Sequence, residues 1–146
     1  MLAIKRPATK IGLAVAALLA ASSALAQDYT ATCSIAGFTG TAYIEATREH
    51  PYVFINNVGY QIKAPSGQEN SHFARLSVQQ VGPPPQLPSD WKEYNANLKQ
   101  DNFKHKMIIR TYLWALGPVS QNVRFTFAGP NGSRPTCTGT VRMSPL

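Results

Sequence analysis

The segments Ala31-Thr-Cys33-Ser-Ile35 and Pro135-Thr-Cys137-Thr-Gly-Thr-Val141 carry the two cysteines of this chain. In each segment apolar and polar residues alternate, which predicts a β-strand whose cysteine faces inward. Two cysteines in an exported chain usually form a disulfide, and the start of this chain indicates export, as described next. We therefore predict a Cys33–Cys137 disulfide that spans 104 positions (137 − 33) and ties the first strand to the last.

Residues 1–26 have the three parts of a secretory signal peptide. A basic start, an apolar run of 11 residues and a small-x-small cleavage site follow one another at Lys5, Arg6 and Lys10, at 11–21 and at Ala24-Leu25-Ala26. The apolar run is too short for a membrane-spanning helix, which needs about 20 residues. We predict cleavage before Gln27 and a single domain over 27–146 that is periplasmic or secreted and has no transmembrane segment.

The mature chain is only mildly basic. Without the three signal-peptide cations, 11 lysines and arginines (14 − 3) stand against 7 aspartates and glutamates, which gives a formal net charge of +4 (11 − 7). Proteins dedicated to nucleic acid carry a larger and more clustered excess of positive charge. The charge therefore favours a protein, an acidic polysaccharide or another envelope component as the partner, and not a nucleic acid.

Alternating apolar and polar residues recur along the mature chain and predict seven or eight short β-strands. Clear examples lie at 42–46, 74–78 and 123–127. Short strands in this number, separated by turns, are typical of an all-β fold, an antiparallel β-sandwich of the immunoglobulin-like or a similar kind. A small β-barrel is the alternative, because pairing of the first strand with the last suits either fold.

Two further segments predict local features of the sheets. Residues 52–56 and 60–63 flank Asn57-Val58-Gly59, a short connection that predicts a β-hairpin because Asn and Gly tolerate a positive φ. The run at 107–116 is the most apolar segment of the mature chain. We expect it to form a central strand that is buried on both faces.

One short helix is expected between the strands. The proline-rich stretch 82–88 cannot continue a strand ladder and should be extended chain. Directly after it, Asp90 and Glu93 have the spacing of a helix capping box. The apolar residues that follow recur at the helical spacing i, i+3 and i+7: Trp91, Tyr94 and Leu98. Together these features predict an amphipathic helix at 91–99.

The sequence carries no recognisable catalytic, cofactor or metal signature. Each of the three histidines lies beside polar or charged residues near an expected strand end, without a G-x-S-x-G nucleophile motif: His50, His72 and His105. Glu45 and Glu49 form a close pair of acids, but the strand pattern places Glu45 on an outward face. A blue-copper loop needs a histidine between Cys137 and Met143, and this segment has none. We therefore expect no catalytic residue, no cofactor and no metal ion.

Basic and aromatic residues around 99–110 form a candidate ligand-binding patch. The cations could hold sulfate, phosphate or carboxylate groups, and Phe103 with Trp91 could stack on sugar rings. The simpler interpretation is a charged loop that prevents an edge strand from pairing with other chains. The residues of this patch are Trp91, Phe103, Lys104, His105, Lys106 and Arg110.

These observations favour an exported, non-enzymatic binding domain that recognises an envelope component, a polysaccharide or a protein. The alternative is an inhibitor of a secreted enzyme, such as a lysozyme or a protease, in which an exposed loop at 64–71 or 82–90 blocks the enzyme's active site. A small hydrolase that uses His72 or His105 is the least favoured hypothesis.

Overall fold

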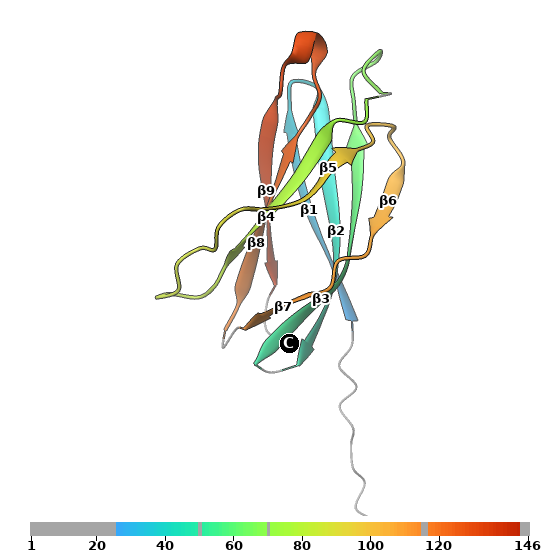
Figure 1. The fold of residues 1–146 in the computed structure, drawn as a ribbon. Helices are drawn as coiled ribbons and strands as arrows, with labels where there is room; N and C mark the ends of the chain where they lie inside the picture. Colours follow the sequence, from blue (N-terminus) through green and yellow to red (C-terminus); the bar gives the residue numbers. More distant parts are fainter. Residues whose placement is uncertain (1–25, 50, 70, 115–116, 144–146) are drawn as a thin grey trace, which may run out of the picture.

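Two antiparallel β-sheets pack face to face in this computed structural model, which describes residues 26–49, 51–69, 71–114 and 117–143 (Figure 1). The strands of sheet A, in spatial order, are β1 (Ala26–Ile35), β2 (Phe38–Glu49), β3 (Tyr52–Lys63) and β6 (Lys104–Met107), and β7 (Thr111–Trp114) also pairs with β3. The strands of sheet B, in spatial order, are β5 (Lys92–Leu98), β4 (Ala74–Val81), β8 (Val119–Thr126) and β9 (Thr136–Met143). A short 3-10 helix, η1 (Pro130–Gly132), lies between β8 and β9. The predicted antiparallel sandwich is confirmed.

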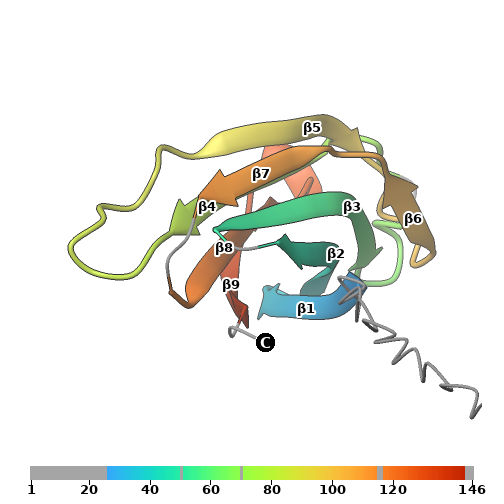
Figure 2. The ribbon, with the colours of Figure 1, turned by 90° about the horizontal axis from the view of Figure 1, so that it is seen from below.

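The order of the strands distinguishes this sandwich from an immunoglobulin domain. Here β1, β2 and β3 are consecutive neighbours in sheet A, whereas an immunoglobulin domain places its third strand in the other sheet. Viewed along the strands, the two sheets form two layers, and the edge strands β1 and β9 lie on the same side of the molecule (Figure 2).

The core between the sheets is built around three stacked phenylalanines. The ring centroids of Phe38 and Phe127 are 5.0 Å apart, and those of Phe125 and Phe127 are 6.0 Å apart. All three side chains are almost fully buried. Because β2 and β8 each alternate buried and half-buried residues along most of their length, one face of each strand supplies the core. Burial of such aromatic side chains is a major source of stability in a domain of this size.

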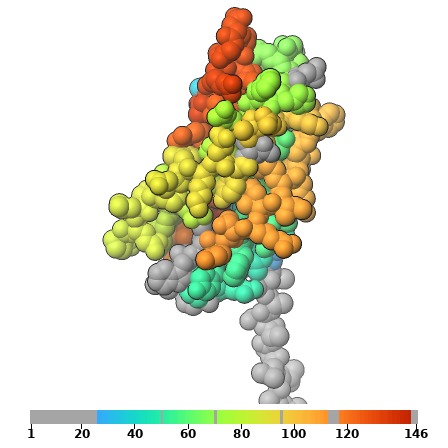
Figure 3. Space-filling view, viewed as in Figure 1, coloured from blue at the N-terminus to red at the C-terminus, as the bar shows by residue number. Residues whose placement is uncertain are grey.

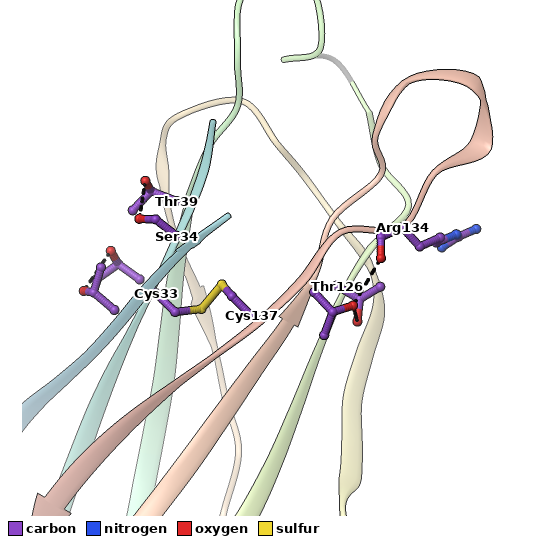
Figure 4. The surroundings of a disulfide bond; sticks show 9 residues. Cys33, Ser34, Thr39, Thr126, Arg134 and Cys137 are labelled. Carbon is purple, nitrogen blue, oxygen red and sulfur yellow. Dashed lines mark hydrogen bonds between the residues drawn. A yellow bond between two sulfur atoms is a disulfide. The ribbon is translucent and has the colours of Figure 1, made fainter. Parts of the chain in front are cut away.

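The predicted disulfide is confirmed, and it connects the two sheets. Cys33 on β1 and Cys137 on β9 are bonded, with their Cα atoms 5.8 Å apart (Figure 4). The two strands are not hydrogen-bonded to each other, since β1 pairs with β2 and β9 pairs with β8. The bond therefore joins the edge strands of two different sheets and closes one side of the sandwich.

The hairpin predicted at 57–59 is wrong, because β3 is one continuous strand. The ladder between β2 and β3 shifts register between Glu45 and Ala46, and Asn56 is the extra residue on β3. This irregularity is a β-bulge, which interrupts the apolar and polar alternation without turning the chain. The interruption beside Asn and Gly resembled a turn in the sequence.

The helix predicted at 91–99 is also wrong, because this segment forms the edge strand β5. Tyr94, Ala96 and Leu98 are alternate residues of β5 and so belong to the same face of the strand. Leu98 is fully buried, and Tyr94 and Ala96 are half-buried. The intervening residues are polar types that are depleted in strands: Glu93, Asn95 and Asn97. Pairing with β4 overrides these weak local preferences.

The central strand predicted at 107–116 is wrong as well. The segment contains the end of β6 and then β7, two short strands at the edge of sheet A. Ile108 is 75% exposed and Tyr112 is 65% exposed, so the apolar run is not buried on both faces. Residues 115 and 116 lie outside the described residues. An interrupted edge of this kind is a poor template for pairing with another chain.

The predicted signal peptide lies outside the described residues except for Ala26, where β1 begins. Within the described ranges, no helix has the length and apolar character needed to cross a membrane. A disulfide such as Cys33–Cys137 is typical of an oxidising compartment.

Candidate ligand-binding site

The outer face of sheet A carries a hollow of about 560 Å³, which we call the sheet A hollow. Its position follows from the β-bulge, because the bulge changes which residues of β3 face outward. Before the bulge Tyr52 and Phe54 face outward, and after it the buried residues are Val58, Tyr60 and Ile62. The residues that line the hollow are Asp28, Tyr29, Thr30, Tyr43, Glu45, Asn57, Gly59, Lys104, His105 and Lys106.

Gly59 keeps the hollow open. It pairs with Tyr43 on β2 and with Lys106 on β6. A Cβ atom at this position would lie 3.1 Å from the backbone oxygen of His105 and 3.5 Å from the Cβ of Tyr43. The absence of a side chain therefore leaves space between the outward side chains of the two neighbouring strands.

The Tyr43 ring forms one wall and holds a cation. The Lys104 Nζ lies 3.8 Å from the centroid of this ring, at the distance of a cation–π interaction. The Tyr43 hydroxyl donates a hydrogen bond to Gln61 Oε1 at 2.9 Å, and Gln61 Nε2 donates to the Asn102 carbonyl at 2.8 Å. These contacts connect β2, β3 and the turn before β6, so they hold the Tyr43 ring on which the Lys104 ammonium lies.

The charges around the hollow are balanced. Lys104 and Lys106 contribute two positive charges, and Asp28 and Glu45 contribute two negative ones. Glu45 Oε2 accepts a hydrogen bond from Asn57 Nδ2 at 2.7 Å. The hollow therefore offers ammonium donors near β6 and carboxylate acceptors near β1 and β2, which suits a ligand with both acidic groups and hydrogen-bond donors.

His105 faces away from the two lysines on either side of it. Its ring stacks on Tyr60, with centroids 4.9 Å apart, and its Nε2 lies 2.7 Å from Asp101 Oδ1. Burial raises the pKa of Tyr60, whose hydroxyl accepts a hydrogen bond from the Lys99 backbone N–H. This arrangement anchors β6 to β3, and it makes His105 part of the packed structure.

The Asp101 carboxyl is held in its charged form. Partial burial by itself raises the pKa, but hydrogen bonds from His105 and from the Phe103 backbone N–H outweigh it, so the pKa of Asp101 lies below its usual value. Hydrogen bonds to a carboxylate favour its ionised state. Asp101 therefore stabilises the turn that leads into β6.

The structure divides the predicted patch between the two faces of the sandwich. Lys104 and Lys106 lie together in the hollow. Trp91 lies on the outer face of sheet B, where the Arg124 guanidinium carbon is 3.7 Å from its ring centroid. His105 also lines the hollow, although its ring stacks on Tyr60. Phe103 is 70% exposed before β6, and Arg110 is exposed between β6 and β7. Trp91 and Phe103 therefore do not form a shared stacking surface.

A cluster of three aromatic rings on the outer face of sheet A was not predicted. Tyr52, Phe54 and Tyr112 have ring centroids 5.9 to 6.4 Å apart, and Tyr112 stands nearly perpendicular to Tyr52 at 84°. Tyr52 and Phe54 alternate with the buried Val53 and Ile55, so this part of β3 has hydrophobic or aromatic residues on both of its faces. That composition resembles a fully buried strand, so the sequence held no clear signal for the cluster.

The remaining histidines lie elsewhere. His72 is exposed ahead of β4, and His50 lies outside the described residues. In the described ranges, no group of three or more His, Cys, Asp or Glu side chains is placed to share a metal ion. No protein-family model matches the chain, and no curated protein matches its sequence.

Proposed function

We propose that this chain is an exported, non-enzymatic binding domain and that it recognises an acidic polysaccharide of an envelope on the outer face of sheet A. The observation that supports the proposal best is the sheet A hollow, which Lys104, Lys106 and Tyr43 line together and in which the Lys104 ammonium lies over the Tyr43 ring. The ammonium groups would bind carboxylate or sulfate groups of the polysaccharide. The Glu45 carboxylate would accept hydrogen bonds from its hydroxyl groups, and the Asn57 amide could donate to them or accept from them.

The aromatic cluster extends the same surface along β3. Tyr52 and Phe54 lie before the bulge, and Gly59 in the hollow lies after it on the same strand. From Phe54 to Gly59 is five residues, or about 17 Å of strand. A polysaccharide chain that runs along β3 would place its acidic groups at the lysines. It would also place the C–H face of a sugar ring on Tyr112, because the face of an aromatic ring is electron-rich.

Export is part of the same proposal. The predicted signal peptide and the Cys33–Cys137 disulfide both support a periplasmic or secreted location. In either location an acidic polysaccharide is accessible to the domain. The two lysines would then act outside the cytoplasm, where salt screens their attraction over about 8 to 10 Å.

The test compares two double variants with equal loss of charge. Lys104→Gln with Lys106→Gln should reduce retention on an immobilised carboxylated polysaccharide, such as polygalacturonate, by roughly 5- to 30-fold in affinity, since each lost ion contact contributes about 0.5–1 kcal/mol. Lys92→Gln with Lys99→Gln removes two exposed lysines on or next to β5 and should leave retention near the wild-type value. Equal losses in the two double variants would exclude the hollow as the site.

A second candidate function, inhibition of a secreted enzyme, is favoured by the loop between β4 and β5. This loop projects from the sandwich, and its Leu87 is 88% exposed (Figure 3). The prolines stiffen it, and Ser89 anchors it: the Ser89 N–H donates to the Gln80 carbonyl at 2.8 Å, and the Ser89 Oγ accepts from the Gln80 N–H at 3.0 Å. A stiff loop with an apolar tip is preorganised to enter a pocket of a partner.

Incubation with a panel of secreted proteases and lysozymes distinguishes the two functions. An inhibitor would give stoichiometric loss of enzyme activity, and Leu87→Asp would restore the activity. Ile108→Asp is the matched control, because Ile108 is also strongly exposed but lies at the edge of sheet A. Full enzyme activity at a tenfold excess of the protein would exclude inhibition of the enzymes tested.

A further inference from the structure

A second charged surface lies on the outer face of sheet B. It contains Arg75 on β4, Arg124 on β8 and Arg134 in the segment before β9, and we call these three residues the arginine cluster. They line a shallow hollow of about 460 Å³. Its other lining residues are Ser77, Glu93 and Thr126. Arg75 is far from the other two in the sequence, so only the fold brings the three cations together.

The strand register places Arg75 and Arg124 close to each other. Arg75 pairs with Thr126 across β4 and β8, and Ser77 pairs with Arg124. The two arginines are therefore diagonal neighbours on one face, with Cα atoms about 7–8 Å apart. Leu76, next to Arg75 on β4, and Phe125, next to Arg124 on β8, are both buried in the core. Both guanidinium groups must therefore lie over the outer face of the sheet.

Arg134 reaches the same place from the other side. Its Nη1 donates a hydrogen bond to the Phe73 carbonyl at 3.3 Å, directly before β4 begins. This contact brings the Arg134 guanidinium to the end of the strand that carries Arg75. In Figure 4 the Arg134 side chain points away from the disulfide, with Thr126 nearby. Three segments thus direct guanidinium groups toward one hollow.

The cluster has more positive than negative charge. Glu93 is the one acid among the lining residues, and its Oε2 lies 3.3 Å from Arg75 Nη1. Three positive charges against one negative charge leave a local surplus of +2 (3 − 1). Like charges on neighbouring strands repel each other, so a bound anion would lower the energy of this arrangement. The sheet A hollow differs in this respect, because its charges are balanced.

Trp91 orients Arg124. The guanidinium carbon lies 3.7 Å from the centroid of the indole ring, at the distance of a cation–π interaction. A guanidinium stacked on a ring keeps its N–H groups at the edge of the plane, where they remain free to bind an anion. Among the described residues, Arg124 has no hydrogen-bond acceptor in the protein. Its donors are therefore available to a ligand.

We propose that the arginine cluster is a binding site for a phosphate or sulfate group. Arginine binds oxyanions through paired N–H donors, which gives geometric specificity as well as attraction. A tetrahedral oxyanion presents three or four oxygens to guanidinium groups that approach from three segments, whereas a carboxylate presents only two. The Ser77 and Thr126 hydroxyls add donors at the base of the site. This site is on the opposite face from the lysines, so it does not depend on the function proposed above.

The test titrates the full mature protein with sodium phosphate, sodium sulfate and sodium acetate in separate experiments at constant ionic strength. The arginine side-chain N–H resonances report binding. Phosphate or sulfate should give saturable shifts at all three arginines, with an affinity at least tenfold above that for acetate, and the tighter of the two identifies the group. Shifts that do not saturate, or acetate that binds equally well, would overturn the proposal.

Variants locate the site. Arg75→Gln and Arg124→Gln should each weaken binding of the preferred anion by about tenfold or more, in line with a loss of about 1.4 kcal/mol or more. Arg142→Gln is the control, because Arg142 is exposed on β9 opposite Ser120, while Arg124 pairs with Thr138, four residues away. All three variants replace exposed or half-exposed residues, and an unchanged melting temperature checks their fold. Equal weakening by Arg142→Gln would show nonspecific attraction and overturn the proposal.

Discussion

At Gly40 the two sheets pack so closely that there is no room for a side chain. It pairs with Cys33 on β1, and a Cβ atom added to it would lie 2.4 Å from the Cγ of Phe125. The Phe125 ring is buried and pairs with Cys137 on β9, so neither the ring nor the strand can move away easily. Gly40→Ala should therefore destabilise the protein by about 1–3 kcal/mol through overpacking, measured by urea unfolding.

Gly117→Ala is the matched control for this substitution. A Cβ atom at Gly117 would lie 3.4 Å from the nearest atom, Pro83 Cγ, which is an ordinary van der Waals distance. Its free energy of unfolding should change by less than about 0.5 kcal/mol, as for most surface positions. Equal effects of the two substitutions would show that the contact between Gly40 and Phe125 does not limit the packing.

At the same scale, Asp101 should make stability depend on acid pH. Its pKa in the folded protein lies below the ordinary value of 3.8, so its contribution to stability is fully present above that value and is lost as the pH falls through the lower folded pKa. Asp101→Asn should cost about 1 kcal/mol at neutral pH and should remove this acid dependence. Thermal unfolding between pH 7 and 2 measures both effects, with the exposed Asp90→Asn as the control. Parallel pH curves for the two variants would contradict the role of Asp101.

Among the elements, the strands with unbroken alternation could be predicted from the sequence, and those with irregular pairing could not. On β2 and β8 one parity is apolar and buried throughout, so pattern and structure agree. On β3 the bulge at Asn56 changes the parity, and on β5 two register shifts accompany a polar composition. Both irregularities depend on the partner strand, which a local pattern cannot contain.

The candidate site was predictable only where its residues are neighbours in the chain. Lys104 and Lys106 share a parity on β6, and the sequence indicated them together. Tyr43 and Gly59 complete the hollow from β2 and β3, and their contribution depends on register. Trp91 was grouped with Phe103, but it lies beside Arg124 on the outer face of sheet B, because the segment that follows it is the strand β5 and not the expected helix. A single sequence does not indicate which residues the pairing of distant strands will bring together.

The bulge on β3 leads to a prediction for this element. Deleting Asn56 leaves Ile55 inward and Asn57 outward, so β3 becomes a regular strand and every other residue keeps its face. The variant should fold and lose about 1 kcal/mol, chiefly the hydrogen bond from Asn56 to Thr47. Circular dichroism and thermal unfolding measure the outcome.

Deleting Gln61 from the same strand is the control. This deletion moves the fully buried Ile62 to the outer face and turns Lys63 toward the core, which should cost at least about 2–3 kcal/mol. Gln61 and Asn56 are both half-buried amides with side-chain hydrogen bonds, so the two deletions differ in their effect on parity and in the one additional hydrogen bond that Gln61 makes. If deletion of Asn56 were as damaging as deletion of Gln61, the bulge would have a structural role beyond setting the outward face.

At the scale of the whole molecule, the two proposed binding surfaces lie on opposite faces, and one side of the sandwich is held by a covalent bond. The edge strands β1 and β9 approach closely there, because a Cβ atom on Gly139 would lie 2.9 Å from the Thr32 carbonyl oxygen. Among the described strands, each of the two has only one hydrogen-bonded neighbour. We therefore expect the Cys33–Cys137 bond to be an important restraint that keeps this side of the sandwich closed.

Removal of the disulfide should accordingly destabilise the whole domain and loosen that side first. For a loop that spans 104 residues, the loss of chain-entropy restraint gives an upper value of about 4.7 kcal/mol, and removal of a native disulfide from small secreted domains in general costs about 2–5 kcal/mol. Cys33→Ser with Cys137→Ser should lower the melting temperature by on the order of 10 °C. Amide hydrogen exchange should rise more in β1 and β9 than in β2 and β8, since only the edge strands lose a restraint.

Thr32→Ser with Thr138→Ser provides the control next to the same bond. A double cysteine variant with an unchanged melting temperature would mean that contacts between the sheets hold this side closed by themselves.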